Sequence, residues 1–140
     1  MGTPRDKDAR RFYLAGGRRK DDGRNLARFD QSYRGAAYLA GYAIECMLKA
    51  LIIVQSGRRK HEVIAEFRGS KAHNFDHLRF LYFSYGGAKL PMKVTEAFVL
   101  VKSQGWSPDW RYEPAFLPFE ELEAFLDAVD RIYNWADQRM

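Results

Sequence analysis

The sequence has little cysteine: Cys46 is the only one among 140 residues. A single cysteine cannot form an intrachain disulfide, so the sequence predicts a fold without one and favours a cytoplasmic location. Cys46 lies inside an apolar run, and we interpret it as a small core side chain rather than a nucleophile. The first eight residues contain no apolar core, so no signal peptide is predicted.

Strand-like alternation of apolar and polar residues is also scarce, and no internal repeat or low-complexity segment is found. Helical spacing is common instead, most clearly near the C-terminus. The chain is 46% hydrophobic and long enough to bury a core. We therefore expect one all-α domain over residues 1–140, an up-and-down bundle of four to five helices, with residues 1–7 as a frayed tail.

Glycine, proline and capping residues divide the chain into these helices. Residues 8–28 read as one amphipathic helix, or as two with a weak point at Gly16 and Gly17. A long helix is expected to end near Gly57, and Asn74 or Asp76 to cap a later one. The remaining expected helices are a short one at 61–67 and longer ones at 76–85, from 91, and from 118, with a loop over 103–117.

The segment 36–54 is almost wholly apolar, and only Glu45 and Lys49 add charge to it. A helix that is apolar nearly all round is a buried helix, and residues four apart lie on one of its faces. The segment is nearly long enough to span a bilayer, but two central charges make that costly, so no membrane association is expected. The sequence predicts a central helix with a buried ion pair.

Charge is unevenly distributed along the chain. Residues 1–34 hold ten Lys and Arg against five Asp and Glu, whereas residues 109–137 hold eight acids against two bases. A basic segment can track the phosphates of a nucleic acid. A solvated helix surface and head-to-tail contact with a partner are two further interpretations, and all three stay open.

Three segments together resemble the HEPN family of small helical bundles. They are AAYLAGYAIECMLKALI (36–52), HNFDHL (73–78) and WRYE (110–113). The resemblance implies an up-and-down bundle, a homodimer, and a role close to RNA or nucleotides. Many members are metal-independent ribonucleases that act as toxins in toxin–antitoxin or phage-defence systems. Some are paired with a small nucleotidyltransferase partner, and others bind or act as scaffolds without catalysis.

The nuclease signature of that family is an arginine followed four to six residues later by a histidine. Arg68 and His73 match this spacing, but earlier in the chain than the family places it; the late segment has Arg111 without a following histidine. Metal-free RNA cleavage needs a proton-transfer group and a cation, roles that suit histidine and arginine. Arg68, His73 and Arg111 are therefore the catalytic candidates, and chance remains the alternative explanation of the match.

The candidate binding residues are Glu45, Lys49, His77, Trp110 and Tyr112. For Glu45 and Lys49 the alternatives are a catalytic remnant, a pocket anchor, a structural pair that reaches the bundle surface, or a pair that also binds Arg111 or His77. The tryptophans at 106 and 110 either stack on bases or cover the core. His73 and His77 have metal-ligand spacing without a third ligand on their face, so neither a metal nor a cofactor is expected.

The sequence is compatible with three functions. The first is a HEPN-like protein that binds RNA, a nucleotide or a partner protein, in a toxin–antitoxin or defence setting. The second is a metal-independent HEPN ribonuclease toxin. The third is a dimeric adaptor without a nucleic-acid role.

Overall fold

A computed structural model describes residues 2–30, 33–112 and 118–140; of residues 29, 30, 111 and 112 it describes the backbone only. The described residues form helices and turns and no strand, so the expected all-α class is confirmed. The α-helices are α1 (Lys7–Asn25), α2 (Tyr33–Ser56), α3 (Lys60–Glu66), α4 (Phe75–Ser84), α5 (Met92–Ser103) and α6 (Phe119–Gln138).

Shorter elements connect these helices. A π-helical turn, Leu26–Asp30, follows α1, and 3₁₀ turns occupy Gly57–Arg59, Ser70–His73 and Pro108–Tyr112. After the 3₁₀ turn that Gly57 begins, α3 folds back along α2 instead of extending it. Phe67, which follows α3, lies with its ring centre 5.5 Å from the Lys49 ammonium in the middle of α2. With the seven-residue α3 set apart, the described residues form five longer helices, within the four to five that the sequence predicts.

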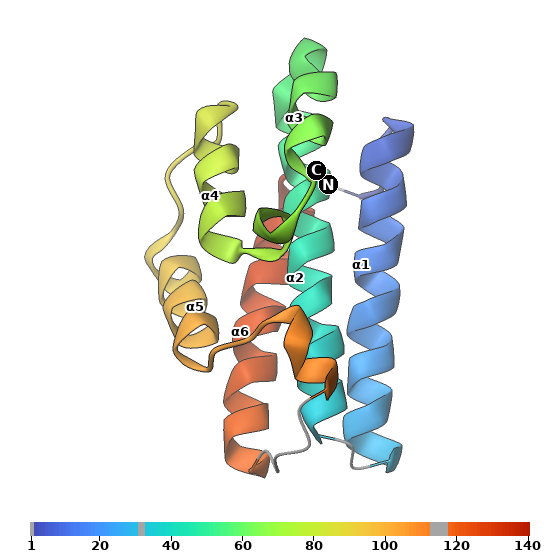
Figure 1. Cartoon of the computed structure of the whole chain (residues 1–140), viewed down its shortest axis with the longest axis vertical. Coiled ribbons are helices and arrows are strands. Elements are labelled where there is room, and N and C mark those ends of the chain that lie inside the picture. Colours follow the sequence, from blue (N-terminus) through green and yellow to red (C-terminus); the bar gives the residue numbers. More distant parts are fainter. Residues whose placement is uncertain (1, 31–32, 113–117) are drawn as a thin grey trace.

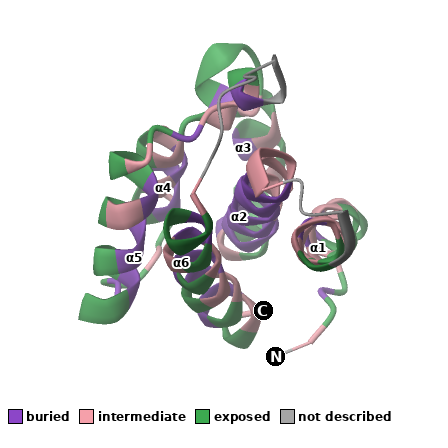
Figure 2. Cartoon of the chain, turned by 90° about the horizontal axis from the view of Figure 1, so that it is seen from below, coloured by how far each residue is buried: buried purple, intermediate pink, exposed green. Residues whose placement is uncertain are grey.

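Helix α2 is the centre of the bundle. It lies between α1 and α6, with α4 and α5 on the side away from α1 (Figure 1). Seen from below, its residues are buried over most of its circumference (Figure 2). Ile44, Met47, Leu48 and Leu51 are at most 1% exposed. Each such side chain contributes roughly 1.5–3 kcal/mol through burial, which is why this apolar segment becomes the core.

Helix α1 runs unbroken through Gly16 and Gly17, so the two-helix alternative for residues 8–28 is wrong. Gly16 is buried against α2, and a Cβ there would lie 3.1 Å from the Met47 sulfur. The glycine is explained by close helix packing, and the contact with α2 offsets its low helix propensity.

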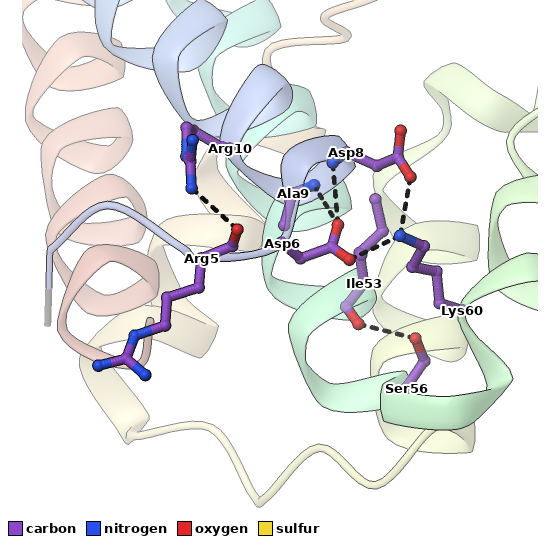
Figure 3. A network of polar contacts seen from close by, with 8 residues as sticks. All are labelled: Arg5, Asp6, Asp8, Ala9, Arg10, Ile53, Ser56 and Lys60. Carbon is purple, nitrogen blue, oxygen red and sulfur yellow. Dashed lines mark hydrogen bonds and ion pairs between the residues drawn. The ribbon is translucent and has the colours of Figure 1, made fainter.

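The start of α1 is attached to α3. Asp6 caps α1 by accepting hydrogen bonds from the Asp8 and Ala9 N–H groups at 2.9 and 3.0 Å. Its other oxygen lies 2.6 Å from the Lys60 ammonium, which also contacts Asp8 (Figure 3). These contacts fix where α1 begins and join two helices that are distant in the sequence.

Other helix ends follow the capping expectations. Asn74 caps α4 by accepting a hydrogen bond from the His77 N–H at 2.9 Å, so Asn74 is the cap and Asp76 is not. Pro91 and Pro118 directly precede α5 and α6. Gly57 directly follows α2 and has φ +53°, a backbone conformation that favours glycine.

The helical segment Tyr33–Glu66, taken as one span, is long and apolar enough to cross a membrane. However, 72% of its most apolar stretch is buried inside the bundle. The core helix of a helical bundle has the same length and composition, so this property is only weak evidence for a membrane span.

Candidate functional site

The site begins with the buried pair on α2. Lys49 Nζ donates to Glu45 Oε2 at 2.8 Å, and both side chains are less than 10% exposed. The ammonium also lies 5.7 and 5.5 Å from the ring centres of Phe12 and Phe67, within cation–π range. The predicted ion pair is confirmed, and its carboxylate has a second oxygen left for another partner.

That second oxygen contacts a histidine. Glu45 Oε1 lies 2.8 Å from His73 Nδ1, and the His73 side chain is 38% exposed. A carboxylate only accepts hydrogen bonds, so Nδ1 carries the proton in this contact. In the neutral ring Nε2 is then a free acceptor. Glu45 thus fixes both the tautomer and the orientation of a partly exposed imidazole.

His73 lines a cleft of about 530 Å³. The cleft lies between the 3₁₀ turn Ser70–His73, the start of α4, the end of α5 and the loop that follows it. Its volume falls in the range of small-ligand sites. Its lining combines apolar and polar side chains: Ser70, His73, Asn74, Phe75, Asp76, Phe98, Val101, Lys102, Trp106, Ser107, Pro108 and Asp109.

Trp106 forms one wall of the cleft and is itself 9% exposed. Its ring stacks on Phe75 with centres 4.9 Å apart and planes 12° from parallel. Its indole N–H donates to the Tyr38 carbonyl at 3.2 Å. A Cβ at position 41 would lie 2.0 Å from the indole nitrogen, so the ring fits against α2 because Gly41 has no side chain.

The structure does not bring all the candidate residues together. His77 lies in the first turn of α4, where its ring stacks on Phe80 at 6.3 Å, so His73 and not His77 contacts Glu45. Arg68 is exposed and is not part of the cleft lining. Trp110 is buried against Phe125 at 5.8 Å, with the Arg34 guanidinium 4.8 Å over its ring. The side chains of Arg111 and Tyr112 lie outside the described part.

Three charged residues that line the cleft were not predicted as site residues from the sequence: Asp76, Lys102 and Asp109. Lys102 Nζ lies 2.7 Å from Asp76 Oδ2, and this hydrogen bond lowers the pKa of Asp76. The two residues are 26 positions apart and belong to different helices. No local spacing in the sequence links them, so only the packing of α4 and α5 reveals the pair.

Cys46 is not among the residues that line the cleft. Burial raises the pKa of the Cys46 thiol to about 11, and the Glu45 charge adds to the effect. Such a thiol is a poor nucleophile at neutral pH. Within the described ranges no three His, Cys, Asp or Glu side chains are grouped to hold a metal ion.

No protein-family model, curated protein or solved structure matches this chain.

Proposed function

We propose that this chain is a cytoplasmic HEPN-like homodimer that binds RNA or a nucleotide in the cleft beside His73, in a toxin–antitoxin or defence setting. One observation carries the proposal: a buried carboxylate, Glu45, orients a partly exposed histidine at the edge of a ligand-sized cleft. Ion pairs that only stabilise a core do not need to extend to an open cavity. A nucleotidyltransferase-type protein is the partner that this family resemblance suggests.

The surroundings of His73 suit a nucleic acid. Arg68 and Lys71 are exposed on the same short segment, and cations there can contact phosphates. Phe75 is the partly exposed aromatic side chain of the cleft, and its ring can contact a base. The exposed cations Lys7, Arg11 and Arg18 add a second basic surface on α1. Together these features favour nucleic acid over an uncharged protein surface.

Single-stranded RNA binding at several salt concentrations tests this proposal. Binding should weaken steeply with salt because phosphate contacts release counterions. His73→Ala should lower affinity, whereas His61→Ala, on the exposed surface of α3, should not. Absence of binding at low salt would reject the proposal and favour the dimeric adaptor.

The Glu45–His73 contact favours a second candidate, a metal-independent ribonuclease. His73 Nε2 would take the proton from a ribose 2′-hydroxyl while O2′ attacks the adjacent phosphorus. The P–O5′ bond then breaks, giving a 2′,3′-cyclic phosphate and a 5′-hydroxyl end that receives a proton. Arg68 or Arg111 is the candidate cation for the developing phosphate charge.

Cleavage of RNA in the presence of EDTA tests this second function. His73→Asn keeps an N–H donor for Glu45 but removes Nε2, so it should abolish cleavage without changing the melting temperature. His61→Ala is the matched control. If the wild-type protein cleaves no RNA, and its expression does not arrest growth, the ribonuclease candidate fails while the binding proposal stands.

A further inference from the structure

The two carboxylates that line the cleft differ in their ion pairing, and this decides what the cleft can hold. Asp76 pairs with two cations, Lys102 at 2.7 Å and Arg79 at 3.3 Å. Asp109 is exposed, and its carboxylate has no ion-pair partner among the described side chains. Its backbone N–H donates to the Ser107 hydroxyl at 3.2 Å, which fixes the turn that carries it. Of the two carboxylates that line the cleft, Asp109 is therefore the one left open to a ligand.

A carboxylate without a paired cation repels a phosphate placed beside it and favours a group that donates hydrogen bonds. The lining also contains the apolar side chains Phe75, Phe98, Val101, Trp106 and Pro108. A flat, uncharged ring with N–H donors on one edge matches this combination. Nucleobases have these properties, and a volume of about 530 Å³ is sufficient for one.

Among the common bases, guanine has the hydrogen-bond donors that match a carboxylate. The Watson–Crick edge of guanine presents two adjacent donors, N1–H and the 2-amino group, which match the two oxygens of a carboxylate. Adenine and cytosine place an acceptor beside their donor, and uracil places acceptors on both sides of it. A carboxylate repels those lone pairs. Asn74 adds a donor for guanine O6, because its own oxygen already accepts from the His77 N–H.

We propose that the cleft binds a guanine base through the Asp109 carboxylate, stacked within its apolar lining, with the attached phosphate outside near Arg68 and Lys71. This inference rests on the proposed function and names its base preference. It places the ribose and its phosphate on the His73 side of the cleft. It also separates two contributions to RNA binding: a salt-dependent one from phosphates and a salt-independent one from the base.

Titration of the full chain with nucleosides, followed by tryptophan fluorescence, tests the inference. Guanosine should bind about tenfold more tightly than inosine, which lacks the 2-amino group, and more tightly than adenosine, cytidine or uridine. Guanosine and 5′-GMP should bind within about threefold of each other, because the phosphate stays outside. Asp109→Asn should remove the preference for guanosine over inosine. Asp127→Asn, an exposed acid on α6, is the matched control.

The outcomes separate this inference from the function on which it rests. Salt-dependent RNA binding without any nucleoside preference would overturn the guanine cleft and leave the RNA-binding proposal intact. A guanosine preference that survives in Asp109→Asn, with the melting temperature unchanged, would overturn the role of Asp109. Binding of neither RNA nor nucleosides would reject both.

Discussion

Glu45 and His73 are 28 residues apart in the sequence, yet the Glu45 carboxylate lies 2.8 Å from the His73 imidazole. The same carboxylate holds the Lys49 ammonium with its other oxygen. A row of polar contacts therefore runs from the core of the bundle to the edge of a cleft. Burying charged side chains costs stability. The contact between Glu45 and His73 at an open cleft gives a functional reason for keeping this buried pair.

The buried pair predicts a large and asymmetric effect of mutation. Glu45→Gln should destabilise the protein by about 3–5 kcal/mol, because it leaves the Lys49 charge buried without its partner. Glu45→Leu combined with Lys49→Met should restore much of that stability, since neither charge remains. Urea unfolding measures both variants. A loss below about 1 kcal/mol for Glu45→Gln would show that the pair is not desolvated as the structure indicates.

Gly41 predicts a steric effect at the wall of the cleft. A new Cβ would lie 2.0 Å from the Trp106 indole nitrogen, so Gly41→Ala should cost about 1–3 kcal/mol and shift tryptophan fluorescence to the red. Gly17→Ala is the matched control, because its Cβ meets only the Tyr133 hydroxyl, at 3.2 Å. That change should alter the free energy of unfolding by at most about 1 kcal/mol. Equal effects of both variants would contradict the packing of Trp106 on α2.

Cys46 should react slowly in the folded protein. Burial raises its pKa from 9.0 to about 11, so the thiolate fraction near pH 8 falls by about a hundredfold. Alkylation by iodoacetamide should therefore be at least that much slower in buffer than in denaturing urea, where the thiol is exposed. Comparable rates in the two conditions would mean that Cys46 is accessible and its thiol unperturbed.

The contacts of Asp6 predict a dependence of stability on pH. The hydrogen bond from Lys60, then those from the Ala9 and Asp8 N–H groups, lower the pKa of Asp6 below 3.8 in the folded state. The resulting stabilisation is complete above the unfolded pKa and is lost as pH falls through the lower, folded value. The stability advantage of wild type over Asp6→Asn should therefore be present at pH 6 and shrink toward pH 2.

Two variants separate the cap from the ion pair at this position. Asparagine caps helices as well as aspartate, so Asp6→Asn removes only the charge. Asp6→Ala removes the cap as well and should cost about 1 kcal/mol more. Thermal melts of both variants measure the difference. If the two variants melt alike, the two N–H contacts drawn in Figure 3 do not stabilise α1.

Much of the fold could be predicted from short-range patterns. The segment 36–54 becomes α2 because its apolar residues leave no polar face, and Asn74 caps α4 because its side chain reaches an N–H three residues on. Short-range patterns left open whether residues 8–28 form one helix or two. Gly16 weakens an isolated helix, and only the contact with Met47 on α2 reverses that preference.

The sequence by itself determined the helical class, most helix boundaries and the Glu45–Lys49 pair, because these depend on residues within one or two helical turns of each other. Only the tertiary structure decided that His73 contacts Glu45 and that Asp109 lies in the same cleft. Those contacts join segments that are far apart along the chain. Their geometry depends on how whole helices pack, and local spacing does not encode it.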